Sequence, residues 1–236
     1  MISIPVLMYH FINPSSTDYL TVSTELFERQ IAYLADRHRI LTIREAFETI
    51  ENTPDDLQNS IVITFDDGMS DNYRYAAPIL EKYNLFATFF IIAGFIGSDN
   101  RWNHRAYHIS QHMGKKELRD LHRRGFDIQS HTLTHQRLTK LPDDELENEF
   151  LEAKNILERL TGINPVAISY PYGAADERCL RLCRRYYRLG FTSGGQGTYF
   201  WNEDRCQICR IYVAAQDEPE NLEQKISNYR KGNPDV

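Results

Sequence analysis

The stretch Ile61-Val-Ile-Thr-Phe-Asp-Asp-Gly68 places two adjacent carboxylates and a glycine directly after an apolar, β-branched run. Such a run is typical of a buried strand in an α/β protein. Asp66 and Asp67 would then lie at the carboxyl end of a parallel strand, the edge where these folds place their chemistry. Gly68 lets the backbone turn sharply. A solvated turn capped by aspartate is the alternative, so the function of this stretch depends on whether the two carboxylates have partners.

Predicted strands and helices alternate along the whole chain. Short apolar runs bounded by turn residues indicate strands, at 4–9, 41–45, 61–65, 86–92, 126–129, 166–169, 189–192 and 208–213. Amphipathic segments with capping residues indicate helices, at 23–37, up to about 50, and at 76–83, 116–124, 142–160, 176–187 and 222–229. This alternation predicts a single α/β domain over residues 1–236 with a mostly parallel sheet. Seven or eight strands in about 230 residues favour closure into a barrel.

The composition narrows the classes of partner. A formal net charge of −6 argues against nucleic acid or an anionic membrane as the main partner. No apolar stretch approaches the roughly 20 residues that a membrane span requires, so no transmembrane segment is expected. The N-terminus carries no basic leader followed by an apolar segment. We therefore expect a soluble, cytoplasmic protein, and nothing in the sequence sets its oligomeric state.

The four cysteines occur as two close pairs, Cys179-x3-Cys183 and Cys206-x2-Cys209. Two such pairs could together hold a structural zinc ion. The first pair, however, falls one helical turn apart on an apolar face, and the second lies in a predicted strand. Reduced, buried thiols are the favoured interpretation because free cysteine is among the most buried residue types.

Several predicted strands end on residues that can do chemistry. His131 and His135 are spaced i, i+4, so that on a helical turn both imidazoles could reach one ion. A carboxylate would complete a set of two histidines and one acid with open positions for water and substrate. Tyr172 follows another strand, and His10 follows the first. Each also has a simpler interpretation: surface histidines, a hydrogen-bonded interior histidine, or a tyrosine packed in a turn.

Three motifs in order carry a family resemblance: Thr64-Phe-Asp-Asp-Gly68, Ser130-His-Thr-Leu-Thr-His135 and Tyr170-Pro-Tyr-Gly173. They resemble the polysaccharide deacetylases of carbohydrate esterase family 4, also called the NodB-homology domain. The opening Pro5-Val-Leu-Met-Tyr-His10 is similar to the poly-N-acetylglucosamine deacetylase branch, which places the histidine motif near the N-terminus. Trp102-Asn103-His104 also resembles that branch.

The resemblance implies a distorted, TIM-like (β/α) barrel, often with seven strands, that removes acetyl groups from N-acetylated sugars. It implies that Asp67, His131 and His135 bind a divalent metal, usually Zn²⁺, with Co²⁺, Ni²⁺ and Fe²⁺ as alternatives. Asp66 would be the general base and His10 the general acid. Tyr172 would lend its backbone N–H to the oxyanion and contact the substrate.

The chain departs from the family pattern in places. Many members begin the third motif with an arginine that orients the base, whereas this chain has Ser169 there. We hypothesise that Arg210 substitutes for it. Trp201 is the candidate for lining the sugar groove, while His104, His108 and His112 are expected at the rim or surface. The rival functions are hydrolysis of a non-sugar amide, iron(II) oxygenation, and sugar binding without catalysis.

Overall fold

The structure is a computed structural model that describes residues 1–15, 19–100, 110–162, 164–194 and 197–232. The motif residues Trp102, Asn103 and His104, together with His108, lie outside these ranges. Within the described ranges, no helix combines the length and apolar character that crossing a membrane requires.

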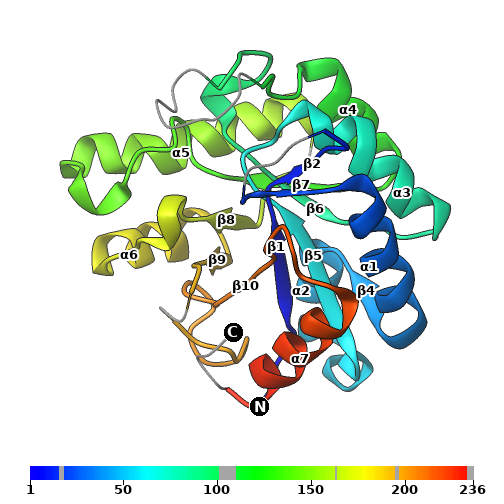
Figure 1. Cartoon of the computed structure of the whole chain (residues 1–236). Coiled ribbons are helices and arrows are strands. Elements are labelled where there is room, and N and C mark those ends of the chain that lie inside the picture. The colour runs from blue at the N-terminus through cyan, green and yellow to red at the C-terminus, as the bar shows by residue number, and fades with distance from the viewer. Residues whose placement is uncertain (16–18, 101–109, 163, 195–196, 233–236) are drawn as a thin grey trace.

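A curled parallel sheet forms the centre of the molecule (Figure 1). Seven strands follow one another in the order β10-β1-β5-β6-β7-β8-β9, β4 pairs with β5, and β2 pairs separately with β3. The strands are β1 (Val6–Tyr9), β2 (Phe11–Ile12), β3 (Thr21–Val22), β4 (Arg39–Leu41), β5 (Ser60–Phe65), β6 (Thr88–Ile91), β7 (Asp127–Ser130), β8 (Ala167–Ser169), β9 (Leu189–Phe191) and β10 (Ile211–Tyr212).

The segment 205–212, which we call the seam, connects the two ends of this sheet. Ile208 exchanges backbone hydrogen bonds with β9, donating to Gly190 O and accepting from Thr192 N at 2.8 and 2.9 Å. Three residues later, β10 pairs in parallel with β1. The predicted seven-strand, distorted TIM-like barrel is therefore confirmed. The last strand is shorter than the predicted 208–213 because the first part of that stretch pairs with β9 instead.

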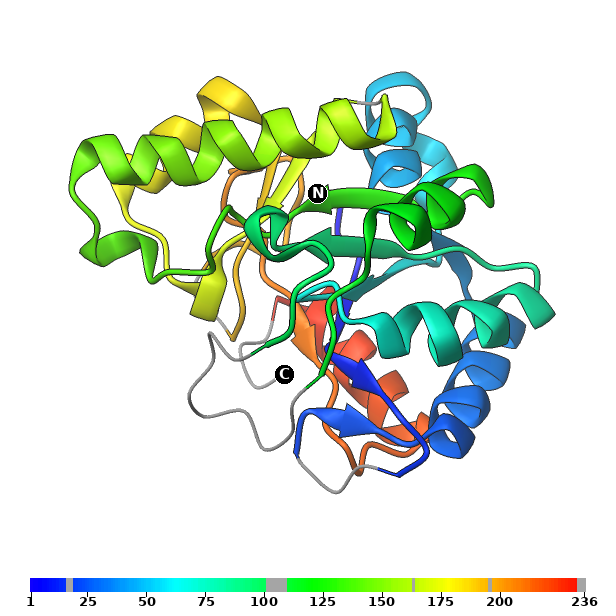
Figure 2. The same cartoon turned by 90° about the horizontal axis from the view of Figure 1, so that it is seen from above.

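Helices cover the outside of the curled sheet (Figures 1 and 2). They are α1 (Thr24–Arg37), α2 (Ile43–Asn52), α3 (Ala77–Lys82), α4 (Lys115–Arg123), α5 (Asp143–Thr161), α6 (Glu177–Tyr186) and α7 (Pro219–Arg230). Five short turns of 3₁₀ or π helix join them to the strands, at Pro54–Leu57, Asn72–Ala76, Ala93–Phe95, Leu138–Lys140 and Pro171–Gly173. The predicted helix at 76–83 begins earlier than expected, because the π-helical turn precedes α3.

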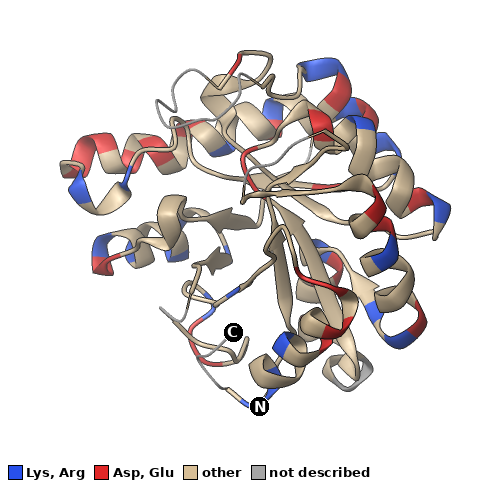
Figure 3. Ribbon diagram, viewed as in Figure 1, with Lys and Arg blue, Asp and Glu red and all other residues tan. Residues whose placement is uncertain are grey.

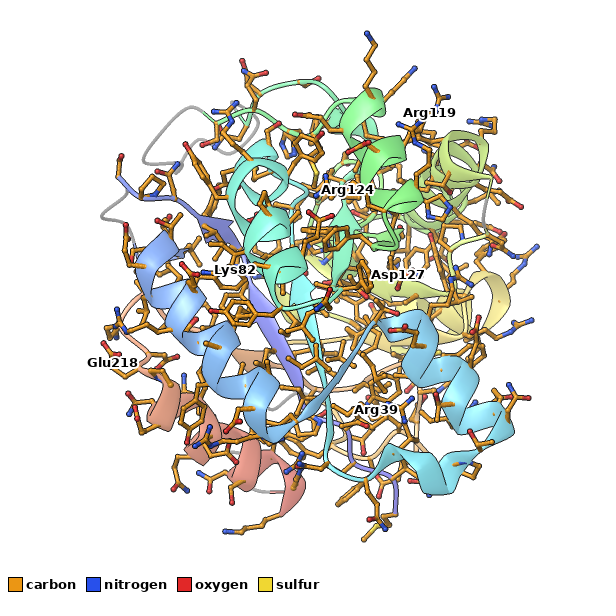
Figure 4. The ribbon with its side chains drawn as sticks, turned by 90° about the vertical axis from the view of Figure 1, so that its right-hand side faces the viewer. Arg39, Lys82, Arg119, Arg124, Asp127 and Glu218 are labelled. Atoms are coloured by element: carbon orange, nitrogen blue, oxygen red, sulfur yellow. The ribbon has the colours of Figure 1, made fainter. Side chains whose placement is uncertain are left out.

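Local sequence explains where the helices start and stop. Ser23 caps α1 by accepting from Leu26 N, and Thr42 with Glu45 forms the predicted capping box of α2. Gly162 ends α5 in the left-handed conformation, at φ 77°. Charged side chains lie mostly on the outer helices (Figure 3). Arg124, labelled in Figure 4, links α3 to α4 through Glu81 at 2.7 Å and Asp120 at 3.0 Å.

The alternation of side chains along each strand sorts them into two layers. One layer packs between the sheet and the helices, where the rings of Tyr9 and Phe65 stack 5.4 Å apart and Phe27 of α1 meets both. Residues one position away point into the barrel, where Val62 and Phe90 belong to a second cluster. The same alternation directs the residues after the carboxyl ends of β1 and β5 inward, and this edge holds the candidate site.

Candidate metal centre

The residues selected from the sequence follow the carboxyl ends of four parallel strands. His10 follows β1, Asp66 and Asp67 follow β5, and His131 follows β7. Tyr172 lies three residues after Ser169, the last residue of β8. β1 pairs with β5, and β6 separates β5 from β7. Because all these strands run parallel, their carboxyl ends meet at one edge of the barrel.

Asp67, His131 and His135 each turn a potential ligand atom toward a common point. These three atoms lie within 4.8 Å of one another, and the group could hold a metal ion. Asp67 Oδ1 is 3.4 Å from Nε2 of His131 and 3.4 Å from Nε2 of His135. Two imidazoles and one carboxylate are a donor set that suits a divalent transition metal and leaves positions for water and substrate.

The two histidines are brought together differently from the sequence prediction. We expected a helical turn, but residues 131–135, the histidine loop, are not helical. Thr132 and His135 adopt left-handed backbone conformations, at φ 66° and 59°, which fold the loop back on itself. The i, i+4 spacing thus pairs the imidazoles, with ring centroids 4.8 Å apart, through a tight loop.

Hydrogen bonding leaves the ligand atoms available to a cation. Nδ1 of His131 lies 2.9 Å from Ser169 O, which can only accept, so Nδ1 carries a proton; in the neutral ring Nε2 then keeps its lone pair. Asp67 Oδ1 is buried and accepts no hydrogen bond from the described residues. A buried carboxylate oxygen without a donor is costly unless a cation satisfies it. These residues therefore fit a bound metal ion.

The surroundings of Asp67 and His135 also favour the protonation states that metal binding needs. Burial alone would raise the pKa of Asp67, but the nearby histidines hold it well below its usual range. Burial lowers the pKa of His135 to about 4. For His131, burial lowers the pKa and the two aspartates raise it, with a net increase. An ionised Asp67 and a neutral His135 are the forms that coordinate a metal.

Asp66 has a different set of neighbours. Arg210 donates to both of its oxygens, from Nη1 to Oδ1 at 2.7 Å and from Nη2 to Oδ2 at 2.6 Å. Ser169 Oγ donates to Oδ2 at 3.2 Å and accepts from Arg210 at 2.8 Å. Burial opposes ionisation, but Arg210 and His131 lower the pKa of Asp66 to about 2. The hypothesis that Arg210 takes the place expected for an arginine at position 169 has this geometry in its support.

Tyr172 lies at the rim of the site. Its backbone is left-handed, at φ 60°, within the short turn Pro171–Gly173, and its side chain is unusually exposed, at 58 %. The Tyr172 and His135 ring centroids lie 4.9 Å apart, and the guanidinium carbon of Arg137 also lies 4.9 Å from the Tyr172 ring centroid. An exposed aromatic ring beside the centre offers a surface on which a sugar could pack.

His10 lies at the same edge of the barrel. Its ring is 6.3 Å from that of Tyr212, and its charge contributes to lowering the pKa values of Asp66 and Asp67. Asn72, at the start of the π-helical turn, donates from Nδ2 to His10 O at 2.8 Å. Unusual π-helical turns are frequent at functional sites. The carboxyl end of β1 thus holds His10 near both carboxylates.

Two expectations about individual side chains are wrong. Trp201 is fully buried, packs on Phe191 and donates from Nε1 to Ile4 O at 3.0 Å, so no sugar can reach it. His112 was expected at the rim or surface, but it is only 3 % exposed and its Nδ1 donates to Asp67 O at 2.9 Å. Both predictions failed for the same reason. Trp201 and His112 are buried by segments that are distant in the sequence, and the residues next to them give no sign of this contact.

All four cysteines lie among the described residues, are buried and form no disulfide. Cys179, Cys183 and Cys206 pack in one cluster with Tyr170, whereas Cys209 belongs to the main core. Burial raises the pKa of the Cys179 thiol to about 11. Buried cysteines packed in these clusters agree with the favoured interpretation of the cysteines as core residues.

Comparisons with known proteins point to one family. A family model described as polysaccharide deacetylase matches residues 53–191. The Bacillus subtilis (strain 168) protein YxkH, whose name assigns it provisionally to the polysaccharide deacetylases, is 31 % identical over 192 residues, which cover 80 % of this chain and 64 % of the relative. A poly-beta-1,6-N-acetyl-D-glucosamine N-deacetylase of Staphylococcus aureus (strain MSSA476) is 27 % identical over 188 residues, which cover 75 % of this chain and 62 % of the relative.

The solved structure of the Streptococcus pyogenes deacetylase PplD in complex with acetate is similar throughout. It superposes with a TM-score of 0.82 at 28 % identity, over 95 % of this chain and 98 % of that one. The chain spans slightly less than two thirds of the length of the two curated relatives, at 64 % and 62 %.

Proposed function

Because this chain belongs to the polysaccharide deacetylase family, we propose that it is a metal-dependent hydrolase that removes the acetyl group from an N-acetylhexosamine. The sugar would be part of a glycan, a glycolipid or an activated sugar, and acetate would be released. We propose Zn²⁺ as the ion, with Co²⁺, Ni²⁺ and Fe²⁺ as alternatives, and residues 1–236 as one catalytic domain. The cytoplasmic location stays a prediction.

One observation carries this proposal: the convergence of Asp67, His131 and His135 beside a second, differently held carboxylate. Asp66 Oδ2 lies 3.8 Å from His131 Nε2, so the base and the ligand set share one site. Three ligands with open positions are typical of a catalytic metal centre rather than a structural one. The similarity to deacetylases of known sequence and structure agrees with that chemistry.

The proposed roles follow from the difficulty of hydrolysing an amide. Its carbonyl carbon is a poor electrophile and its amine a poor leaving group. A divalent ion, when bound, polarises the carbonyl and lowers the pKa of a bound water. Asp66 would accept the proton of the attacking water. Arg210 keeps Asp66 ionised and oriented but makes it a weak base, so this site needs water that is already acidified.

Two other groups would act on the acetamide itself. As water adds to the carbonyl carbon, its oxygen gains negative charge, and the backbone N–H of Tyr172 would donate a hydrogen bond to it. The ring of Tyr172 would contact the sugar. When the carbon–nitrogen bond breaks, His10 would give a proton to the departing nitrogen, a task for which a positioned imidazole is well suited. The products are acetate and a free amino sugar.

The experiment is acetate release from a panel of N-acetylated nucleotide sugars, lipid-linked sugars and oligosaccharides, with zinc present. We expect release from at least one class, and a rate lowered about 10²- to 10⁴-fold in Asp66→Asn, which preserves the size of the side chain. Release from non-sugar amides alone would redirect the proposal to another substrate. Binding of an acetylated sugar without acetate release under any metal would contradict catalysis and favour a sugar-binding protein.

A further inference from the structure

The turn that carries both carboxylates has an unfavourable backbone. Asp67 and Gly68 are both left-handed, at φ 68° and 70°. Residues other than glycine rarely adopt this conformation because Cβ approaches the carbonyl oxygen. A side chain at Gly68 would be strained, because L residues rarely adopt a φ of 70° and its Cβ would also come within 2.8 Å of Ile91 Cδ1. A turn of this kind persists only where surrounding contacts hold it.

Residues 111–113, which we call the strap, supply such contacts from outside the turn. Met113 N donates to Gly68 O and Ser70 N donates to Gln111 O, both at 2.8 Å. Met69 and His112 face each other as an antiparallel bridge. Residues 68–70 and the strap are thus joined by an isolated antiparallel bridge beyond the end of β5.

His112 extends this pairing to the peptide bond that follows Asp67. Its Nδ1 lies 2.9 Å from Asp67 O, and a carbonyl oxygen can only accept, so the ring must donate. The histidine is itself fixed, because its backbone N donates to Ser98 O at 2.8 Å and its ring packs 5.8 Å from that of Phe95. At 3 % exposure it has no room to turn away.

We propose that His112 is a positioning residue for the metal ligand Asp67. By fixing the Asp67–Gly68 peptide, its Nδ1–H would hold the left-handed turn in the orientation that points Asp67 Oδ1 at His131 and His135. The inference rests on the proposed metal-dependent function. It extends the centre to the strap, a segment 45 residues further along the chain.

Two polar substitutions test which ring nitrogen matters. The amide nitrogen of His112→Asn falls near the position of Nδ1, whereas that of His112→Gln falls near Nε2. We would measure the Zn²⁺ dissociation constant by chelator competition and record the Co²⁺ absorption spectrum. Loss of an outer partner of a metal ligand weakens binding about 10- to 100-fold. We expect this loss and a changed Co²⁺ spectrum in His112→Gln, with near wild-type values in His112→Asn.

His38→Gln is the matched control. His38 is also a buried histidine, with Nδ1 2.9 Å from Asn59 and Nε2 2.8 Å from Glu223, but it precedes β4 at the opposite end of the sheet. The His38→Gln variant should have a lower melting temperature than the wild type and an unchanged zinc affinity. Equal zinc affinities and Co²⁺ spectra in the wild type and His112→Gln would overturn the proposal.

A measurement on the wild-type chain remains decisive should a variant fail to fold. Nitrogen-15 NMR correlation of the imidazole identifies which nitrogen carries the proton, and we expect Nδ1 for His112. A proton on Nε2 alone would overturn the proposed hydrogen bond. Failure of the wild type to bind zinc, by contrast, would contradict the proposed function and the role of His112 with it.

Discussion

Asp66 and Asp67 are neighbours in the sequence, yet their carboxylates have opposite surroundings. Asp66 is held by the guanidinium of Arg210, while Asp67 faces the Nε2 atoms of two histidines. The left-handed backbone of Asp67 separates the two directions. This difference allows one carboxylate to be proposed as a base and the other as a metal ligand.

Substitutions at the two positions should therefore separate turnover from metal binding. Asp66→Asn keeps the ligand set, so we expect zinc affinity near the wild-type value with kcat lowered about 10²- to 10⁴-fold. His131→Ala removes a ligand and should weaken zinc binding by more than an outer-partner substitution, about 100-fold or beyond. Zinc titration and acetate release measure both. Normal turnover of Asp66→Asn would show that the base is misassigned.

The ion pair between Arg210 and Asp66 makes a second prediction, with a defined pH dependence. Arg210→Met leaves a buried carboxylate without its partner, which should cost about 3–5 kcal/mol at pH 7. The pKa of Asp66 is depressed to about 2, so the pair's contribution is present above the ordinary aspartate pKa and fades as the pH falls toward 2. The free energy of unfolding that Arg210→Met loses should therefore be smaller at low pH than at pH 7.

Urea unfolding of metal-free protein at several pH values measures this. The double variant Arg210→Met, Asp66→Asn removes the unpaired charge and should recover part of the stability. If Arg210→Met loses the same free energy of unfolding at every pH, with Asp66 or with Asn at that position, Arg210 acts through packing alone.

Individual site residues could be predicted from their type and from their position directly after a predicted strand. Asp66, Asp67, His131 and His135 could be selected because each follows a recognisable apolar run or lies in its turn. Trp201 and His112 could not be placed, since both are buried by segments distant in the sequence. A histidine in a long irregular segment carries no signal that it contacts the backbone of a strand 45 residues earlier.

At the scale of elements, α5 anchors the histidine loop. Glu149, 3 % exposed, accepts from Leu133 N at 2.9 Å and Thr134 N at 2.8 Å, and it also contacts the Thr134 hydroxyl. These bonds lie between the left-handed residues Thr132 and His135. A helix side chain thus satisfies loop N–H groups that would otherwise be buried without partners.

Glu149→Ala should consequently loosen the loop. Each buried donor left unpaired costs about 1–3 kcal/mol, and zinc affinity should fall because the two imidazoles lose their fixed spacing. Urea unfolding and zinc titration measure the two effects. Glu152→Ala is the control, because Glu152 lies on the same helix and accepts a hydrogen bond from its neighbour Asn155. Zinc affinity equal in both variants would contradict the anchoring role.

Element positions were largely predictable because capping and periodicity are local. Thr42, Glu45, Ser23 and Gly162 marked helix ends that the structure has. The π-helical turn before α3 and the left-handed histidine loop were not predicted, since both are stabilised by contacts with other segments. The proposed metal ligands His131 and His135 thus lie on backbone that the sequence did not predict.

At the scale of the whole molecule, the seam brings Arg210 to Asp66. Its first part pairs with β9 and its last part with β1, and Arg210 lies between them. Gly190 of β9 makes this approach possible. A Cβ at this position would lie 2.2 Å from Tyr170 Oη and 2.5 Å from Cys206 O.

Gly190→Ala should therefore open the seam. Forcing an extra methyl into a packed core costs about 1–3 kcal/mol, and the displaced segment should also disturb Arg210 and lower turnover. Gly114→Ala is the matched control, because its Cβ would come no closer than 3.8 Å to the nearest atom. Thermal unfolding and acetate release test this. Equal stability of the two variants would contradict the role of Gly190.

The number of predicted strands favoured a closed barrel over an open sheet, but it could not establish that the two ends of the sheet meet. Periodicity indicates that a segment is a strand and not which neighbour it pairs with, so the division of 205–212 between β9 and β1 had no local signal. Arg210 donates to Ser169 Oγ, and its substitution for the arginine expected at position 169 stays a hypothesis.

Zinc titration of the metal-free chain tests the central claim most directly. Acetate release from an active N-acetylated substrate would be followed as zinc is added. Because Asp67, His131 and His135 are the proposed ligands of one ion, activity should be absent after chelation and rise in proportion to zinc until one ion is bound per chain. Activity that survives complete metal removal would contradict the account.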